Sequence, residues 1–159
     1  MSSLRVGIGF DAHSLSAEVP LVLAGVEFPD EPGLVGHSDG DVLSHALVDA
    51  LLGAAGLGDI GELFPSGDES WAGASSLDLL ARAYRVVREG GWELVNADCV
   101  LVGERPRIAP VRDELRARLA GALEVEADRV TVRATTTDGL GFTGRGEGLA
   151  AHAVALLQR

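Results

Sequence analysis

The sequence contains no lysine, only one cysteine and few aromatic residues, and each shortage argues against a class of protein. All 13 basic residues are arginine and the net charge is −11, whereas general nucleic-acid binding depends on clustered cations. The single cysteine, Cys99, excludes an intrachain disulfide and fits a reducing compartment. No apolar run approaches the ~20 residues that span a bilayer, and no signal segment opens the chain. We therefore expect a soluble cytoplasmic protein that binds neither nucleic acid nor membranes.

The absence of lysine also restricts how the chain can bind a phosphorylated ligand. Positive charge would have to come from bound cations, from a few arginine side chains and from backbone amides at helix N-termini. Any phosphate site in this acidic chain is therefore expected to use metal ions.

The composition describes one domain with a core of small side chains. The chain has 159 residues, of which 47% are hydrophobic and only 4% aromatic, together with 21 glycines. Residues 1–159 therefore form a single domain whose core is built from alanine, valine and leucine at close backbone approach. Such packing also suits contacts between subunits. Cys99 is expected to be one of the small buried residues.

The hydrophobic pattern mixes strands with helices. Alternating residues indicate strands, helical spacing indicates helices, and the run 149–157 is ambiguous, although we favour a strand. The order predicts an α/β (α+β) two-layer sandwich, with a mixed, mostly four-stranded sheet and helices on one face. The expected strands cover residues 5–10, 21–23, 26–28, 92–102 and 130–136. The first expected helix has Ser38 or Asp39 as its N-cap and ends in the glycine-rich residues 53–61. Two further helices are expected over residues 75–89 and 110–123.

Two short segments hold three of the four histidines together with several carboxylates. In a strand Asp11 and His13 point to one face, and in a helix positions four apart form one stripe. One helical histidine would complete three ligands with an open fourth position, as in catalytic zinc sites. Each residue alone could instead be a turn-former or a surface residue, and the stripe carboxylates could orient an imidazole or be solvated. The stripe is His37, Asp41, His45 and Asp49.

A threonine-rich segment followed by a glycine-rich segment forms a second candidate site. Residues 134–138 offer hydroxyl and amide donors, the following glycines allow close approach, and Arg145 can pair with an oxyanion. Asp138 would repel a bare phosphate but fits one that carries Mg²⁺. The alternative is a plain glycine-rich hairpin.

Two further loops carry weaker signals. The segment 103–110 contains two prolines and could shape a base or ribose pocket, or be a simple connection. The segment 57–65 could contact a polyol hydroxyl, or only end the preceding helix. His152 stands alone among alanines and is interpreted as structural.

These segments together resemble the 2-C-methyl-D-erythritol 2,4-cyclodiphosphate synthase family, which cyclises a diphosphate in the methylerythritol phosphate route to isoprenoids. The resemblance runs from residue 5 to residue 157. It rests on Gly-Phe-Asp-Ala-His, His-Ser-Asp-Gly-Asp-Val-Leu-Ser-His, Asp-Ala-Leu-Leu-Gly-Ala-Ala, Gly-Asp-Ile-Gly followed by Phe-Pro, and Ala-Thr-Thr-Thr followed by Leu-Gly-Phe-Thr-Gly-Arg-Gly-Glu-Gly, in the family's order.

The resemblance implies a homotrimer with active sites between subunits. One Zn²⁺ per subunit would be held by Asp11, His13 and His45, and a second divalent cation, Mg²⁺ or Mn²⁺, by Asp138. The substrate would be 4-diphosphocytidyl-2-C-methyl-D-erythritol 2-phosphate, whose 2-phosphate attacks the β-phosphorus and expels CMP. The nucleophile belongs to the substrate, so no protein nucleophile is needed. A phosphate-ester hydrolase using zinc-bound water and a non-catalytic trimer that binds isoprenoid diphosphates are the alternatives.

The resemblance also assigns roles to individual residues. His37 and Thr136 would stabilise the transition state, and Phe142, Arg145 and Glu147 would border a central channel for isoprenoid diphosphates. The chain has Asp138, Ser66 and Arg107 where the family commonly has glutamate, aspartate and lysine. The implied substrate contacts are Asp11, His13, His37, Ser38, Asp49, Asp59, Ile60, Gly61, Phe64, Pro65, Ser66, Asp68, Gly103, Arg107, Ile108, Ala109, Ala134, Thr135, Thr136, Thr137, Asp138, Phe142 and Arg145.

Overall fold

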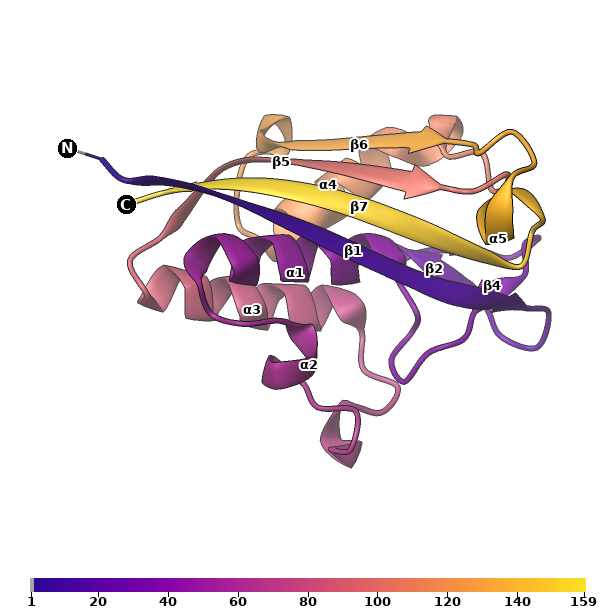
Figure 1. The fold of residues 1–159 in the computed structure, drawn as a ribbon, viewed down its shortest axis with the longest axis horizontal. Coiled ribbons are helices and arrows are strands. Elements are labelled where there is room, and N and C mark those ends of the chain that lie inside the picture. The colour runs from indigo at the N-terminus through magenta and orange to yellow at the C-terminus, as the bar shows by residue number, and fades with distance from the viewer. Residues whose placement is uncertain (1) are drawn as a thin grey trace.

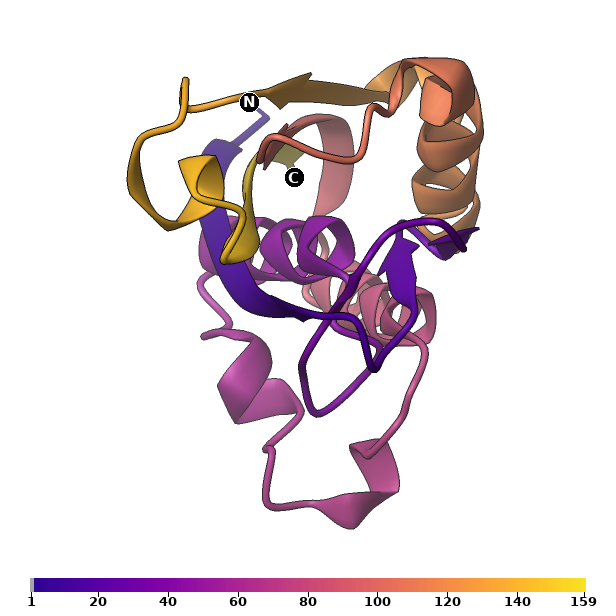
Figure 2. The ribbon, with the colours of Figure 1, turned by 90° about the vertical axis from the view of Figure 1, so that its right-hand side faces the viewer.

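The computed structural model describes residues 2–159 and contains a mixed sheet with helices on one face (Figures 1 and 2). Four long strands and one short strand lie in the order β4-β1-β7-β5-β6. Only β5 and β6 are parallel, and the other neighbours are antiparallel. This confirms the predicted sheet, to which β4 adds a two-residue edge. The strands are β1 (Leu4–Ser16), β4 (Gly33–Leu34), β5 (Glu93–Val102), β6 (Val130–Thr135) and β7 (Gly148–Gln158), with a separate ribbon of β2 (Leu21–Leu23) and β3 (Val26–Phe28).

Three long helices form the second layer. Helix α1 packs directly on β1 and β7, α3 packs on α1, and α4 lies beside β6 (Figure 2). The buried alanine, valine and leucine side chains, and Cys99, lie largely between these layers, as the composition predicts. No helix within residues 2–159 is long and apolar enough to cross a membrane. The helices are α1 (Val42–Ala55), α3 (Ser76–Glu89) and α4 (Arg112–Ala122), with short helices α2 (Ile60–Leu63) and α5 (Gly141–Gly144) and 3-10 turns Glu69–Trp71, Ala109–Val111 and Ala127–Arg129.

Strand β1 presents glycine to the helices and bulky residues to solvent. Gly7 and Gly9 are buried against α1, where a Cβ on Gly9 would lie 1.8 Å from the carbonyl oxygen of Ala46. On the opposite face, Val6 and Ile8 are 69% and 70% exposed and Phe10 is 52% exposed. The sheet therefore has one covered face and one open apolar face.

The start of α1 differs from the sequence prediction. The helix begins at Val42, and Asp41 is its N-cap, accepting hydrogen bonds from the Ser44 N–H at 3.1 Å and the Ser44 hydroxyl at 2.7 Å. Gly40 has φ +74°, which breaks a helix that would start at Ser38 or Asp39. The predicted four-residue stripe is therefore wrong, because His37 lies in the preceding loop.

Most other elements agree with the prediction, with shifted ends. The ambiguous C-terminal run is strand β7, and β1 continues to Ser16, well past the predicted residue 10. Helix α4 starts at Arg112, after a 3-10 turn. The glycine-rich segment after β6 is not a plain hairpin, because it contains α5.

Candidate metal centre and surrounding pocket

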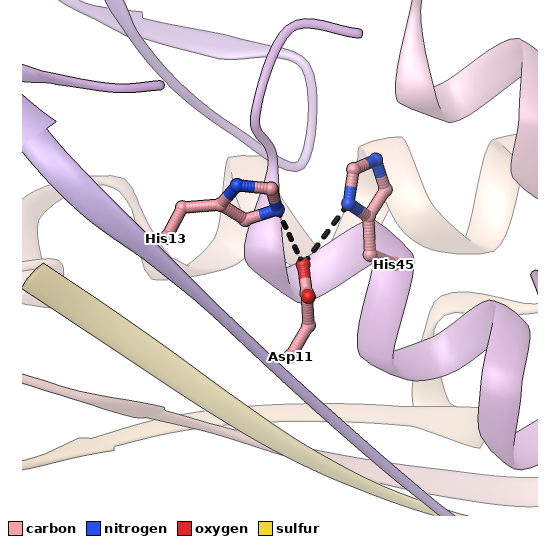
Figure 3. A group of neighbouring side chains, drawn as sticks. All are labelled: Asp11, His13 and His45. Carbon is pink, nitrogen blue, oxygen red and sulfur yellow. Dashed lines mark hydrogen bonds and ion pairs between the residues drawn. The ribbon is translucent and has the colours of Figure 1, made fainter. Parts of the chain in front are cut away.

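Asp11, His13 and His45 meet where β1 crosses the first turn of α1 (Figure 3). The Asp11 Oδ2 atom lies 2.9 Å from His13 Nε2 and 3.0 Å from His45 Nδ1. One possible ligand atom from each residue lies within 4.8 Å of the others. The geometry selects His45 as the helical histidine, a choice that residue spacing alone leaves open.

The local structure explains this meeting. Asp11 and His13 alternate with Phe10 and Ala12 along β1, so they share the helix-facing side with Gly7 and Gly9. The glycines allow the strand backbone to lie against α1, which brings the Asp11 carboxylate to the His45 ring.

The donor set fits a divalent transition metal such as zinc. His13 Nδ1 donates to the Val35 carbonyl oxygen at 2.6 Å, which leaves Nε2 facing the centre. That Nε2 atom is buried and makes no hydrogen bond of normal geometry, despite its proximity to Asp11. Two imidazole nitrogens and one carboxylate with an open side match the ligand set of catalytic zinc sites.

Charge interactions in the cluster favour an ionised carboxylate. Burial alone would raise the pKa of Asp11, but His13 and His45 together lower this pKa to about 2. Contact with the Asp11 carboxylate in turn raises the pKa of His13, against the opposing effect of burial. Asp11 is therefore an anion at neutral pH, ready to bind a cation.

A cavity of about 390 Å³ opens beside the three residues. It is wide enough for a small polar ligand, and its wall contains ten of the residues that the sequence indicated around the substrate and the metal. His37 is exposed and lies on this wall rather than among the metal ligands. The lining residues are Asp11, His13, His37, Ser38, His45, Ile60, Gly61, Phe64, Pro65, Ser66, Gly67, Trp71 and Leu79.

Three aspartates that the sequence predicts as substrate contacts accept hydrogen bonds from backbone N–H groups. Asp49 accepts a hydrogen bond from the Ile60 N–H at 2.7 Å, and Asp59 caps α2 through the Glu62 N–H at 2.9 Å. Burial raises the pKa of Asp49. Asp68 caps the 3-10 turn Glu69–Trp71. Neither Asp41 nor Asp49 hydrogen-bonds an imidazole, so the suggestion that the stripe carboxylates orient the histidines is wrong.

The threonine-rich segment and the loop after β5 lie next to each other at another part of the sheet edge. Because β5 and β6 are parallel neighbours, their carboxyl ends meet there. Gly103 N–H donates to the Thr135 carbonyl oxygen at 3.0 Å, and Gly139 N–H donates to Glu104 at 3.3 Å. The Thr136 hydroxyl donates to Asp138 at 3.2 Å. These two predicted segments thus form one exposed surface.

This surface does not line the cavity beside Asp11. Ala134, Thr135, Thr136, Arg107 and Ala109 are exposed and Thr137 is half-buried. Ile108 is only 2% exposed, so its side chain belongs to the core. Phe142 is 40% exposed, and Arg145 forms an ion pair with Glu147 at 2.5 Å. Within one chain, the predicted site is therefore divided into two separate surfaces.

Sequence reasoning missed several residues around the metal centre. The Val35 carbonyl holds His13, and the Ser76 hydroxyl lies 2.7 Å from His45 Nε2. A backbone carbonyl carries no sequence signal. Ser76 lies 31 residues from His45 and reads as an ordinary residue in the first turn of a helix.

Comparisons with known proteins extend along the whole chain. A protein called 2-C-methyl-D-erythritol 2,4-cyclodiphosphate synthase from Rubrobacter xylanophilus is 57% identical over 162 residues, covering 100% of this chain and 98% of that protein. A solved structure of a synthase of that name in a CDP-bound form is 41% identical with a TM-score of 0.88, covering 96% of this chain and 99% of the other. The bifunctional IspDF from Campylobacter jejuni is 44% identical with a TM-score of 0.95; the match covers 99% of this chain but only 43% of IspDF. The YgbB family model matches residues 4–158, and the chain belongs to the YgbB family.

Proposed function

We propose that this chain converts 4-diphosphocytidyl-2-C-methyl-D-erythritol 2-phosphate to 2-C-methyl-D-erythritol 2,4-cyclodiphosphate and releases CMP, as a cyclising phosphorus-oxygen lyase of isoprenoid precursor biosynthesis. The observation that carries the proposal is the group of Asp11, His13 and His45 beside an open cavity. The family to which the chain belongs supports the same activity.

Asp11, His13 and His45 would hold one Zn²⁺ per subunit. When bound, the ion supplies positive charge for a diphosphate, which is what a chain without lysine requires. The chain's own contribution is to hold the ligands rigidly. Val35 orients His13, and the close contact of β1 with α1 sets the distance between Asp11 and His45.

The two separate surfaces support a homotrimer whose active sites lie between subunits. The residues proposed for the cytidine and diphosphate, from Gly103 to Ala109 and from Ala134 to Asp138, lie apart from the metal centre of the same chain. The uncovered side of the sheet exposes Val6, Ile8 and Phe10, which suits burial against other subunits. A neighbouring chain would thus complete each site.

The remaining roles follow from the placement of each side chain. His37, on the cavity wall, would donate a hydrogen bond to the reacting phosphate, and Thr136 would do so from the neighbouring subunit. Asp138, beside Thr136, would hold the second divalent cation, Mg²⁺ or Mn²⁺. Asp59 and Gly61 would face the erythritol part. Phe142 and Arg145 would border a channel for an isoprenoid diphosphate. We expect the enzyme to act in the cytoplasm.

Product analysis tests the proposal directly. The purified chain is incubated with the cytidine substrate, Zn²⁺ and Mg²⁺, and the products are followed by mass spectrometry and ³¹P NMR. We expect CMP together with a cyclic diphosphate. Linear phosphates alone would show instead a hydrolase that uses metal-activated water.

Matched aspartate variants test the metal centre. Asp11→Ala is expected to lose zinc and to lower kcat/KM by at least about 100-fold while the chain stays folded. Asp113→Ala, on a 95% exposed side chain of α4, is the control and should retain both properties. For a non-catalytic trimer stabilised by metal, His45→Ala would instead unfold or dissociate the protein, whereas an enzyme would give a folded, inactive trimer.

A further inference from the structure

His45 is held on its outer side by a buried serine and a carboxylate. The Ser76 Oγ atom, at the start of α3, lies 2.7 Å from His45 Nε2. The same hydroxyl contacts Asp39 Oδ1, and the Ser76 N–H donates to Asp39 Oδ2 at 3.0 Å. Ser76 is 0% exposed and His45 is 8% exposed. The structure therefore contains a continuous chain from His45 through Ser76 to Asp39.

The carboxylate determines the direction of this chain. An ionised Asp39 can only accept hydrogen bonds, so the Ser76 hydroxyl hydrogen points to Asp39. The oxygen of Ser76 then faces His45 with its lone pairs, and His45 Nε2 must carry the hydrogen and donate it. In the metal-bound centre the ring would then bind the ion through the Nδ1 lone pair. Without the ion, the same Nδ1 atom lies 3.0 Å from the ionised Asp11 carboxylate, which can only accept a hydrogen bond from it.

The second histidine uses the opposite nitrogen by the same logic. His13 donates from Nδ1 to the Val35 carbonyl and presents Nε2 to the centre. Ser38 also lies 3.0 Å from His45 Nε2, but its other polar contact is Ser76 at 3.3 Å rather than a carboxylate. A hydroxyl without such an anchor can donate or accept, so Ser38 does not select a tautomer.

The Ser76 hydroxyl is not needed as a helix cap. The N-cap of α3 is Ser75, whose side chain makes no capping hydrogen bond. Ser76 uses its side chain only toward Asp39, His45 and Ser38. Its burial is thus explained by the contact with the metal centre rather than by the start of the helix.

We propose that Ser76, anchored by Asp39, is a positioning residue that holds His45 in the Nε2–H tautomer, with Nδ1 ready to bind the metal. This inference rests on the proposed metal centre and names residues outside it. Partners of this kind raise the basicity of the ligand and fix the orientation of the ring. Loss of the Ser76 hydroxyl therefore weakens metal binding without removing a ligand.

The test compares Ser76→Ala with Ser75→Ala, its neighbour in the chain. Zinc affinity is measured by competition with a chromogenic chelator, and we expect a loss of about 10- to 100-fold for Ser76→Ala against less than about twofold for Ser75→Ala. The ¹H–¹⁵N signal of His45 Nε2–H in zinc-loaded protein reports the hydrogen bond to Ser76 directly. In the wild type this proton should exchange slowly with water and be shifted downfield, and both effects should be lost in Ser76→Ala.

Asp39→Asn provides a second test that keeps the serine in place, should Ser76→Ala fail to fold. Asp39 accepts hydrogen bonds from the Ser76 N–H, the Ser76 hydroxyl and the Asp41 N–H. An asparagine has only one side-chain oxygen, so its NH₂ group would face at least one of these donors and that hydrogen bond would be lost. We expect weaker zinc binding again.

The outcomes separate the two proposals. Unchanged zinc affinity together with an unchanged His45 Nε2–H signal in either folded variant would overturn the role of Ser76. A wild-type chain that binds no zinc would instead overturn the proposed metal centre.

Discussion

Gly9 is the position where one added methyl group should separate the metal ligands. A Cβ at this residue would lie 1.8 Å from the Ala46 carbonyl oxygen and 2.8 Å from the Ala50 amide nitrogen, both in the backbone of α1. Real Cβ atoms almost never approach closer than 3.0 Å, so in Gly9→Ala the strand and helix must move apart by about 1.2 Å.

The displacement acts directly on the metal centre, because Asp11 is two residues from Gly9 and His45 precedes Ala46. Zinc ligand distances tolerate only about 0.2 Å, so a shift of this size leaves at least one ligand out of reach. We expect zinc affinity and kcat/KM each to fall by at least about 100-fold. Overpacking should also destabilise the fold by about 1–3 kcal/mol.

Gly53→Ala is the matched control on the same helix. A Cβ at Gly53 meets only the Ile8 carbonyl oxygen, at 3.9 Å, so this variant should bind zinc normally and gain up to about 1 kcal/mol of stability. Zinc binding by chelator competition, steady-state kinetics and urea unfolding measure the three quantities. Normal zinc affinity in Gly9→Ala would refute the argument that the glycine contact sets the ligand spacing.

Three further predictions concern the fold and the assembly. Asp41→Ala should lower the free energy of unfolding by about 2–4 kcal/mol in a urea titration, because it removes a buried N-cap and leaves the Ser44 donors unsatisfied; a loss below about 0.5 kcal/mol would contradict this. Burial raises the pKa of the Cys99 thiol to about 12, so a thiol reagent should not label the native protein at pH 8. Relative to Cys99→Ala, the wild type should then lose stability as the pH rises from about 9, the usual thiol pKa, to about 12. Ile8→Asp, on the open sheet face, should leave the chain folded but monomeric in analytical ultracentrifugation and inactive; an active trimer would argue against assembly through this face.

Local residue chemistry was sufficient for much of the fold. Alternation identified β1, a strand was favoured over a helix for β7, and the pair Gly90-Gly91 after a helical run marked the end of α3. The start of α1 was misplaced, because several residues before it can cap a helix. Only the conformation of Gly40 and the buried donors around Asp41 decide between them.

The candidate metal site, like the fold, could be predicted from the sequence only in part. Asp11 and His13 could be paired from their spacing, because side chains two residues apart in a strand point to the same face of the sheet. His37 and His45 could not be separated in this way, because both spacings fit one helix. The structure decides for His45, because the helix starts at Val42 and leaves His37 in the loop before it.

The sequence by itself determined the residue chemistry: a negative chain without lysine, with candidate histidine and carboxylate ligands, a threonine-rich segment, and motifs specific enough to indicate the family. Those properties reside in residue types and short spacings. Only the tertiary structure decided which partners meet across long separations, such as Ser76 with His45 and Gly9 with Ala46. It also decided that the metal centre and the threonine surface lie apart in one chain. The physical reason is that such contacts depend on how β1, α1 and α3 pack, and no local pattern encodes that packing.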